Sequence, residues 1–247
     1  MTRPLDPSRA AAADDTATPP AAARATAPST ARDRAKAERR AALLAAAARL
    51  FAERGFDGVT LGDIGEAAGV SGPAVYRHVA SKQALLGAIL VDVSERLLTG
   101  GRAVAAAHRP APAADRRVAG VSRRSARPAS GVLAALVDFH VAFALAEADV
   151  IRVQDRDLDR LAPDDRRAVR RLQNAYVEVW TDALASPDSH ARDRRAQTPD
   201  AESPAERRVR ALACFGLINS TPHSVRGVPA SRVRPTLTRM ALAALTA

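Results

Sequence analysis

Alanine supplies 58 of the 247 residues, and this bias constrains the fold more than any other feature of the sequence. Alanine has the highest helix propensity of the common residues and is depleted in β-strands. The hydrophobic fraction of 47% contains few large side chains, because only 3% of the chain is aromatic. We therefore predict an all-α protein and exclude a long all-β architecture.

The charge balance favours a polyanionic partner. Lysine and arginine together number 37 against 27 acidic residues, a formal net charge of +10. Such a balance points first to nucleic acid, although arginine-heavy usage, with Lys36 and Lys82 as the only lysines, also fits a GC-rich genome. Cys214 is the only cysteine, which excludes an internal disulfide and a multi-cysteine metal site. No run of 18 apolar residues and no apolar signal core occurs, so we expect a cytoplasmic protein with no membrane partner.

Apolar residues recur with the helical period over most of the chain. Three stretches lack that pattern. We predict a disordered tail over 1–35 and loop-rich segments over 100–129 and 186–203, where glycine, proline and charge accumulate. The expected helices are 37–54, two short helices within 60–79, and 81–98, 131–146, 149–161, 163–185, 204–219 and 230–246.

Residues 60–79, TLGDIGEAAGVSGPAVYRHV, have the pattern of a helix-turn-helix. Thr60 is placed as an N-cap with Asp63 three residues later, and the turn is centred on Gly69. Ser71 can cap the second helix, with Pro73 in its first turn, where a missing N–H is tolerated. Two helices joined by a short turn containing glycine form this motif, and its second helix enters the major groove of DNA.

With its flanking helices, this stretch resembles the TetR/AcrR family of transcriptional regulators. The shared elements are Phe51-Ala-Glu-Arg-Gly55-Phe56, the Thr60 start, Ala68-Gly69-Val70-Ser71, Tyr76-Arg77-His78, and Ser81-Lys82 with Leu85-Leu86. The resemblance covers about residues 36–98 and departs at Val79, where the family usually carries phenylalanine. It implies a DNA-binding domain over 36–80 and a helical effector-binding and dimerisation domain over 81–247.

The predicted DNA-binding residues are Thr60, Ser71, Gly72, Pro73, Ala74, Tyr76, Arg77, His78 and Lys82. The small residues at 72–74 allow close approach to the groove, and Ala74 can meet a thymine methyl. Arg77 can pair with guanine or contact a phosphate, whereas Tyr76 and His78 either contact the DNA backbone or pack the turn. The resemblance implies a phosphate contact for Lys82. With few side chains able to read bases, part of the specificity is expected from DNA shape.

The second half of the chain is predicted to dimerise. A single helix-turn-helix makes few contacts, so such proteins read paired half-sites as dimers. The resemblance implies a four-helix bundle built from the last two helices of each copy. Two apolar stripes support this, although either could be monomer core: Val209, Leu212, Ala213 and Gly216, and Val233, Leu237, Met240, Ala241 and Ala244.

Polar residues interrupt the apolar faces of the later helices. The candidate ligand-binding residues are His140, Gln154, Tyr176, Trp180, Asn219 and His223. Each can instead be a satisfied core residue; together they suit a mostly apolar pocket with a few polar groups. The runs 151–156 and 215–224 look like those of an actinobacterial TetR subgroup, some of whose members respond to acyl-coenzyme A thioesters.

The hypothesis is a dimeric repressor that binds a palindromic DNA operator and is released by a small-molecule effector. We expect no catalytic residue, metal site or cofactor, because the glycines at 62, 65 and 69 fall on a helix and not after a strand, and no nucleophile elbow, phosphate loop or H-E-x-x-H occurs. A DNA-architecture protein without a ligand is the alternative to a repressor. A thermal-shift screen in which no small molecule stabilises the protein would favour it.

Overall fold

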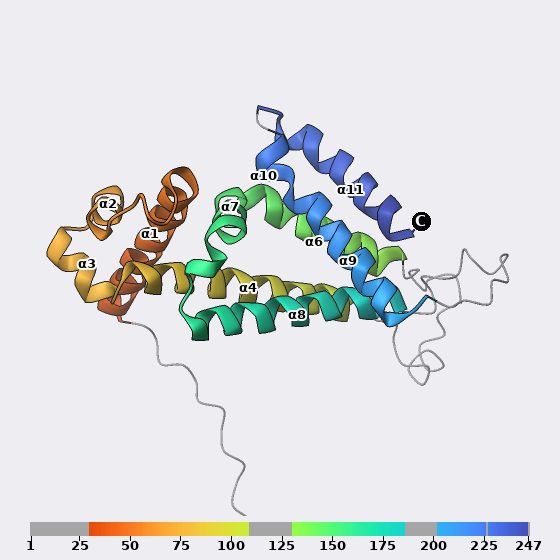
Figure 1. The fold of residues 1–247 in the computed structure, drawn as a ribbon, viewed down its shortest axis with the longest axis horizontal. Helices are drawn as coiled ribbons and strands as arrows, with labels where there is room; N and C mark the ends of the chain where they lie inside the picture. Colours follow the sequence, from red (N-terminus) through yellow and green to blue (C-terminus); the bar gives the residue numbers. More distant parts are fainter. Residues whose placement is uncertain (1–29, 109–129, 186–201, 226, 247) are drawn as a thin grey trace, which may run out of the picture.

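The protein folds into helices, arranged as an elongated molecule with a small helical unit at one end (Figure 1). The computed structural model describes residues 30–108, 130–185, 202–225 and 227–246, and every regular element in these ranges is a helix. The predicted all-α class is therefore confirmed. The helices are α1 Ala31–Arg54, α2 Leu61–Ala67, α3 Gly72–His78, α4 Lys82–Ala107, α6 Ser130–Ala146, α7 Ala148–Asp157, α8 Pro163–Ala185, α9 Pro204–Asn219, α10 Thr221–Ser224 and α11 Ala230–Thr246, with a 3-10 turn over Leu158–Arg160.

The first helix begins earlier than the sequence predicted. Thr30 and Asp33 form a capping box, in which the Asp33 N–H donates to Thr30 Oγ1 at 3.1 Å and the Thr30 N–H donates to Asp33 Oδ2 at 3.2 Å. Because two backbone N–H groups of the helix start are satisfied in this way, residues 31–35 are helical. The predicted disordered tail is wrong for this part, and the rest of it, 1–29, lies outside the described residues.

Helix α4 continues to Ala107, nine residues beyond the predicted end, so a linker over 100–107 is wrong. The Gly100–Gly101 pair, which suggested a linker, is a helix contact. A Cβ atom on Gly100 would lie 2.2 Å from Phe139 Cζ, and one on Gly101 would lie 2.4 Å from Tyr176 Cε2. The pair therefore lets α6 and α8 approach α4 closely. The remaining expected loop residues, 109–129 and 186–201, lie outside the described ranges.

Two apolar clusters form the core. The first joins α1, α2, α3 and the N-terminal half of α4 to Val150 and Val153 of α7 and Val169 of α8. The second lies among α6, α8, α9, α11 and the far half of α4. Helices α4 and α8 run side by side along the length of the molecule (Figure 1). The α1–α3 unit therefore shares its core with the helices that follow it.

Within the described residues, no single helix has both the length and the apolar character to cross a membrane; one bent pair, Gly131–Ala146 with Ala148–Arg160 at 84°, meets the length and composition test.

Candidate DNA-binding interface and buried polar cluster

The contact between α2 and α3 depends on two glycines. Gly69 has a φ of +65°, in the left-handed region that favours glycine, and makes the turn. A Cβ atom on Gly65 would lie 2.5 Å from Val75 Cγ2 and 2.9 Å from the Val70 carbonyl oxygen, so the two helices meet where no side chain fits. Val75 is fully buried at this contact. The arrangement is that of a helix-turn-helix.

Thr60 caps α2 as the sequence predicted. The Asp63 N–H donates to Thr60 Oγ1 at 3.1 Å, and the Thr60 N–H donates to Asp63 Oδ2 at 2.8 Å. These hydrogen bonds hold the pKa of the Asp63 carboxyl below its usual value. Thr60 also donates its hydroxyl to Asp63 at 2.7 Å and is exposed. A DNA contact by Thr60 would therefore share this hydroxyl with the cap.

Helix α3 has one buried side and one exposed side. Val75 faces the core, whereas Tyr76 is 67% exposed and Arg77 is also exposed. Ser71 occupies the N-cap position but its side chain makes no capping hydrogen bond, contrary to the expected cap, so its exposed hydroxyl is not used to start the helix. Helix α3, with α2, lies at the end of the molecule far from α9 and α11 (Figure 1).

The other predicted DNA contacts on α3 are less accessible or are described by backbone alone. Ala74 and His78 are half-buried. Gly72 and Pro73 open the helix, with proline in its first turn as expected, and their side chains lie outside the described part of the structure. The DNA roles of all these residues stay predictions.

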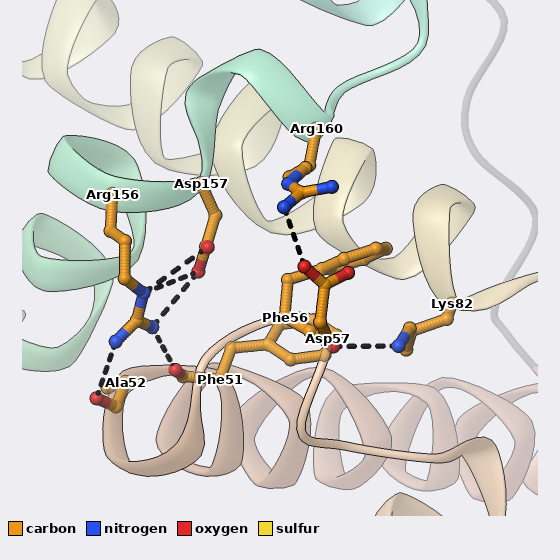
Figure 2. A network of polar contacts seen from close by, with 8 residues as sticks. All are labelled: Phe51, Ala52, Phe56, Asp57, Lys82, Arg156, Asp157 and Arg160. Atoms are coloured by element: carbon orange, nitrogen blue, oxygen red, sulfur yellow. Dashed lines mark hydrogen bonds and ion pairs between the residues drawn. The ribbon is translucent and has the colours of Figure 1, made fainter.

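Lys82 has a structural role that the sequence did not predict. Its ammonium donates to the carbonyl oxygen of Phe56 at 2.7 Å (Figure 2) and to that of Val59 at 2.8 Å. Its Nζ lies 4.3 Å from the centroid of the Phe56 ring. Two of its three N–H donors are thus used to hold the connection between α1 and α2. One donor is left for the predicted phosphate contact, which stays a prediction.

A second polar network joins α7 to the end of α1 (Figure 2). The Arg156 guanidinium donates to the carbonyl oxygens of Phe51 and Ala52 in the last turn of α1 and pairs with the buried Asp157 carboxylate at 3.0 Å. Carbonyls at a helix C-terminus carry partial negative charge, so the guanidinium is stabilising there. Nearby, Arg160 Nη2 lies 2.6 Å from Asp57 Oδ2. These contacts hold the helix-turn-helix unit against the C-terminal helices.

Four of the six predicted ligand-binding residues meet in one buried cluster. His140 Nδ1 lies 3.2 Å from the Tyr176 hydroxyl, and His140 Nε2 lies 3.2 Å from Asn219 Oδ1. Trp180 is fully buried, with its ring centroid 6.0 Å from that of His140 and edge-on to it. We call His140, Tyr176, Trp180, Phe215 and Asn219 the aromatic cluster.

Phe215 was missed as a site residue, although its ring is central to the aromatic cluster. Its centroid lies 4.8 Å from that of His140, and its plane is within 8° of the Tyr176 ring. In the sequence, Phe215 is one more apolar residue of α9, and nothing there distinguishes it from core.

The electrostatics of the aromatic cluster follow from its burial. Burial lowers the pKa of His140 to about 4, although the Asn219 hydrogen bond acts in the opposite direction. Burial also raises the pKa of the Tyr176 hydroxyl. Both side chains are therefore neutral near pH 7. The indole N–H of Trp180 acts on the Tyr176 hydroxyl as a hydrogen-bond donor and lowers its pKa, but the contact falls outside normal hydrogen-bond geometry, so this buried donor is weakly paired.

The other two predicted ligand-binding residues lie elsewhere. Gln154 is half-buried on α7, and among the described residues it has no hydrogen bond or ring contact to the aromatic cluster. His223 is exposed on α10, where its Nε2 lies 3.2 Å from Asp155 Oδ2. The predicted set is therefore divided between the aromatic cluster, Gln154 on α7 and His223 on α10.

The predicted dimer stripes separate into exposed and buried residues. On α9, Val209 is 66% and Leu212 is 46% exposed, and Ala213 and Gly216 are exposed beside them. On α11, Met240 is 49% exposed and Ala244 is exposed, whereas the other three residues of that stripe, Val233, Leu237 and Ala241, are buried in the second core cluster. We call the exposed set Val209, Leu212, Ala213, Gly216, Met240 and Ala244 the α9–α11 patch.

Two comparisons of the sequence with known proteins both match bacterial regulatory proteins. Residues 43–89 match the family model described as bacterial regulatory proteins, tetR family. The HTH-type transcriptional activator FasR of Mycolicibacterium smegmatis is 40% identical over 65 residues, which are 26% of this chain; the match spans about a third of that protein's length (30%).

Solved structures share the fold over most of the chain. The TetR family regulator PfmR from Thermus thermophilus has a TM-score of 0.59 at 19% identity, covering 86% of this chain and 96% of its own. A tetR-family regulatory protein from Rhodococcus RHA1 has a TM-score of 0.63 at 19% identity, covering 84% and 96%. The ketosteroid transcriptional regulator KstR2 of Mycobacterium tuberculosis has a TM-score of 0.59 at 20% identity, covering 83% and 93%.

The fold and the site define a helix-turn-helix protein with a helical C-terminal domain. The motif over Thr60–Val79 stands at one end, and its core continues into the helices that follow. Residues 43–89 are similar in sequence to the tetR family of bacterial regulatory proteins, and the described chain has the fold of the solved TetR-family structures.

Proposed function

We propose that this protein is a transcriptional repressor that binds a palindromic operator in double-stranded DNA as a homodimer. The observation that carries the proposal is the division of α3, with Val75 packed inward and Tyr76 and Arg77 exposed at the end of the molecule. An exposed second helix of a helix-turn-helix is the element that enters the major groove. The residues that we assign to the interface are those predicted from the sequence.

The α9–α11 patch supports the homodimer. Large contiguous apolar patches, of more than a few hundred Å², are rare on monomeric proteins and mark interaction sites. Val209, Leu212 and Met240 are all close to half exposed or more, and the patch includes Ala213 and Gly216, whose small size allows a second helix pair to approach closely. The patch lies on helices far from α3 (Figure 1), which leaves both copies of α3 free for DNA.

The aromatic cluster supports a small-molecule effector. A largely buried His–Tyr–Asn set costs stability unless its polar groups are paired, and the buried Trp180 Nε1 is only weakly paired, with the Tyr176 hydroxyl. A mostly apolar site with a few polar groups suits an apolar ligand that carries a polar end. We propose an acyl-coenzyme A thioester as the effector and its binding as the signal for release from DNA.

The effector proposal predicts a fluorescence change, because Trp180 is the only tryptophan of the chain and belongs to the cluster. Adding palmitoyl-coenzyme A is expected to change the emission of the full protein saturably and to weaken operator binding over the same concentration range. Free coenzyme A is the control for the nucleotide part. Unchanged emission, with operator binding unaffected at all concentrations, would remove this effector class.

The DNA proposal predicts different effects for two neighbouring residues of α3. An operator is first selected with the wild-type protein from a pool of randomised duplexes. Arg77→Ala is expected to weaken operator binding by about 1–3 kcal/mol, roughly five- to 150-fold, and to relax one base position. Tyr76→Ala should weaken binding similarly for all sequences, because a backbone contact fixes register without reading bases.

The measurement is a gel-shift titration at one fixed salt concentration. Arg171→Ala is the matched control, since this exposed arginine lies on α8, away from α3. If neither α3 variant differs from this control, the assigned interface is incorrect.

In vitro transcription distinguishes repression from activation. The curated relative FasR is an activator, which makes activation the second candidate function for this chain. A repressor lowers transcript yield from a promoter that contains the selected operator, and the effector restores it. An activator raises the yield.

A further inference from the structure

We propose that the N-terminal turns of α1 form a second DNA-contacting surface, which binds backbone phosphates flanking the site read by α3. The surface consists of Arg32, Lys36, Arg39 and Arg40, and we call it the α1 basic face. The inference rests on the proposed function, because it concerns where else the same duplex is contacted.

The α1 basic face continues the core-facing side of its own helix. Arg32, Lys36 and Arg39 follow one another at intervals of four and three residues, and Leu43 comes four residues later. Such spacing places all four on one side of a helix. Leu43, Ala47 and Leu50 are buried on that side, but every residue of the basic face is exposed. The same side thus changes from core to solvent-exposed cations within one turn.

The change from apolar to basic residues along this side of α1 marks the point beyond which no other described helix packs against it. If those positions only extended the packing, apolar side chains would be expected there. The acidic residues of this segment offset the charge of the face only in part. Asp33 is held in the capping box with Thr30, from which it attracts Lys36 without forming an ion pair, and Glu38 lies four residues after Arg34 on another side of the helix. Among the described residues no carboxylate forms an ion pair with any of the four cations, although ion pairs are present elsewhere on the surface.

One hydrogen bond locates this face relative to the helix-turn-helix. Arg40 Nη1 donates to the carbonyl oxygen of His78 at 3.4 Å, and His78 is the last residue of α3. The start of α1 also lies beside the junction of α3 and α4 (Figure 1). A rise of 1.5 Å per residue then carries Arg32 roughly 12 Å along the helix from Arg40. Cations at that distance from α3 meet phosphates outside the bases that α3 reads.

The chemistry of the face fits phosphate and not base edges. Its side chains are long cations with no aromatic or amide residue among them, and such contacts supply sequence-independent affinity. The net charge of +10 adds long-range attraction toward the same partner. The α1 basic face would therefore strengthen binding to every duplex and leave the choice of operator to α3.

The test compares two triple variants of the full-length protein. Arg32→Gln, Lys36→Gln and Arg39→Gln remove three cations of the face and keep Arg40, whose side chain holds α3. The matched control, Arg102→Gln, Arg170→Gln and Arg171→Gln, removes the same charge from exposed positions of α4 and α8. Glutamine keeps a helix propensity near that of lysine and arginine, and circular dichroism verifies that both variants are folded.

The probes are the selected operator flanked by 2 or by 10 base pairs on each side, and a 40-base-pair duplex of unrelated sequence. For the wild type, affinity should rise with the longer flanks. Each lost phosphate contact makes the slope of log K against log salt less negative by about 0.9. The loss of three contacts in each protomer therefore reduces the magnitude of a dimer's slope by about 5. The salt slope of the face variant should be reduced by this amount, and longer flanks should no longer raise its affinity. Its preference for the operator over the unrelated duplex should stay unchanged.

Two other results overturn the inference. If the face variant keeps the slope and flank gain of the control while the wild type binds its operator, α1 makes no such contact and the proposed function survives. If the wild-type protein binds no duplex at any salt concentration, the proposed function fails together with this surface.

Discussion

Replacing Val209 and Leu212 with glutamate is expected to convert the proposed dimer to monomers and to weaken operator binding by about 10²- to 10⁴-fold. Both side chains lie in the α9–α11 patch, 66% and 46% exposed in the single chain. Burying four carboxylates at a two-fold interface without partners is far more costly than leaving them in water. The loss of affinity follows because two linked half-site contacts raise the effective concentration of the second by this order.

Sedimentation velocity at micromolar concentration measures the assembly state, and a gel-shift titration measures operator affinity. The control is Val228→Glu, since Val228 is 48% exposed but lies outside the patch, between α10 and α11. The control should stay dimeric and bind normally. A double variant that keeps the mass and affinity of the wild type would show that the patch is not the interface.

The DNA-binding end of the molecule follows closely from local sequence signals. The Thr60 and Asp63 pair, the turn at Gly69 and the inward-facing Val75 are each determined by residues within about ten positions of one another, so pattern and spacing suffice. The caps of α9 and α4, at Ser203 and Ser81, are equally local, since each side chain accepts from a backbone N–H three residues later.

The sequence is a poorer guide where a residue's role depends on a distant contact. Gly100 and Gly101 suggest a linker when read locally, yet they permit close packing against Phe139 and Tyr176, 39 and 75 positions further along the chain. The family resemblance implies a phosphate contact for Lys82, which stays a prediction, but it does not reveal that the ammonium also donates to carbonyls 23 and 26 residues earlier. Contacts between residues so far apart in the sequence leave no periodic pattern or motif from which they could be predicted.

The same reasoning explains the mixed outcome for the candidate ligand-binding residues. An interrupted apolar face identifies a polar residue that is buried, and this signal was sufficient to predict the burial of His140 and Tyr176. It does not reveal which helices meet. The surface position of His223 beside Asp155 and the stacking of Phe215 on His140 therefore do not follow from the pattern.

His140 is expected to make the stability of the protein strongly dependent on pH below neutrality. The pKa of its imidazole is about 4 in the folded protein and near 6.5 in an unfolded chain, because burial disfavours the charged ring. Between these values the unfolded state binds more protons, so the free energy of unfolding falls as pH decreases from 6.5 toward 4. The full loss is about 3 kcal/mol, at about 1.4 kcal/mol per pH unit.

Urea unfolding between pH 7 and pH 5 measures how steeply the free energy of unfolding changes with pH. In this range the effect of His140 is separated from that of the helix caps. The carboxyl pKa values of Asp33, Asp63 and Glu206 are lowered by their capping hydrogen bonds, and their stabilising effect is lost only at more acidic pH, as the carboxylates become protonated. His140→Gln should flatten the slope, since an amide does not titrate and still offers a donor and an acceptor to Tyr176 and Asn219. His223→Gln, at an exposed histidine, should keep the slope of the wild type. A wild type whose stability is level from pH 7 to pH 5 would mean that the ring at position 140 is not held neutral by the core, and the aromatic cluster would then have to admit water.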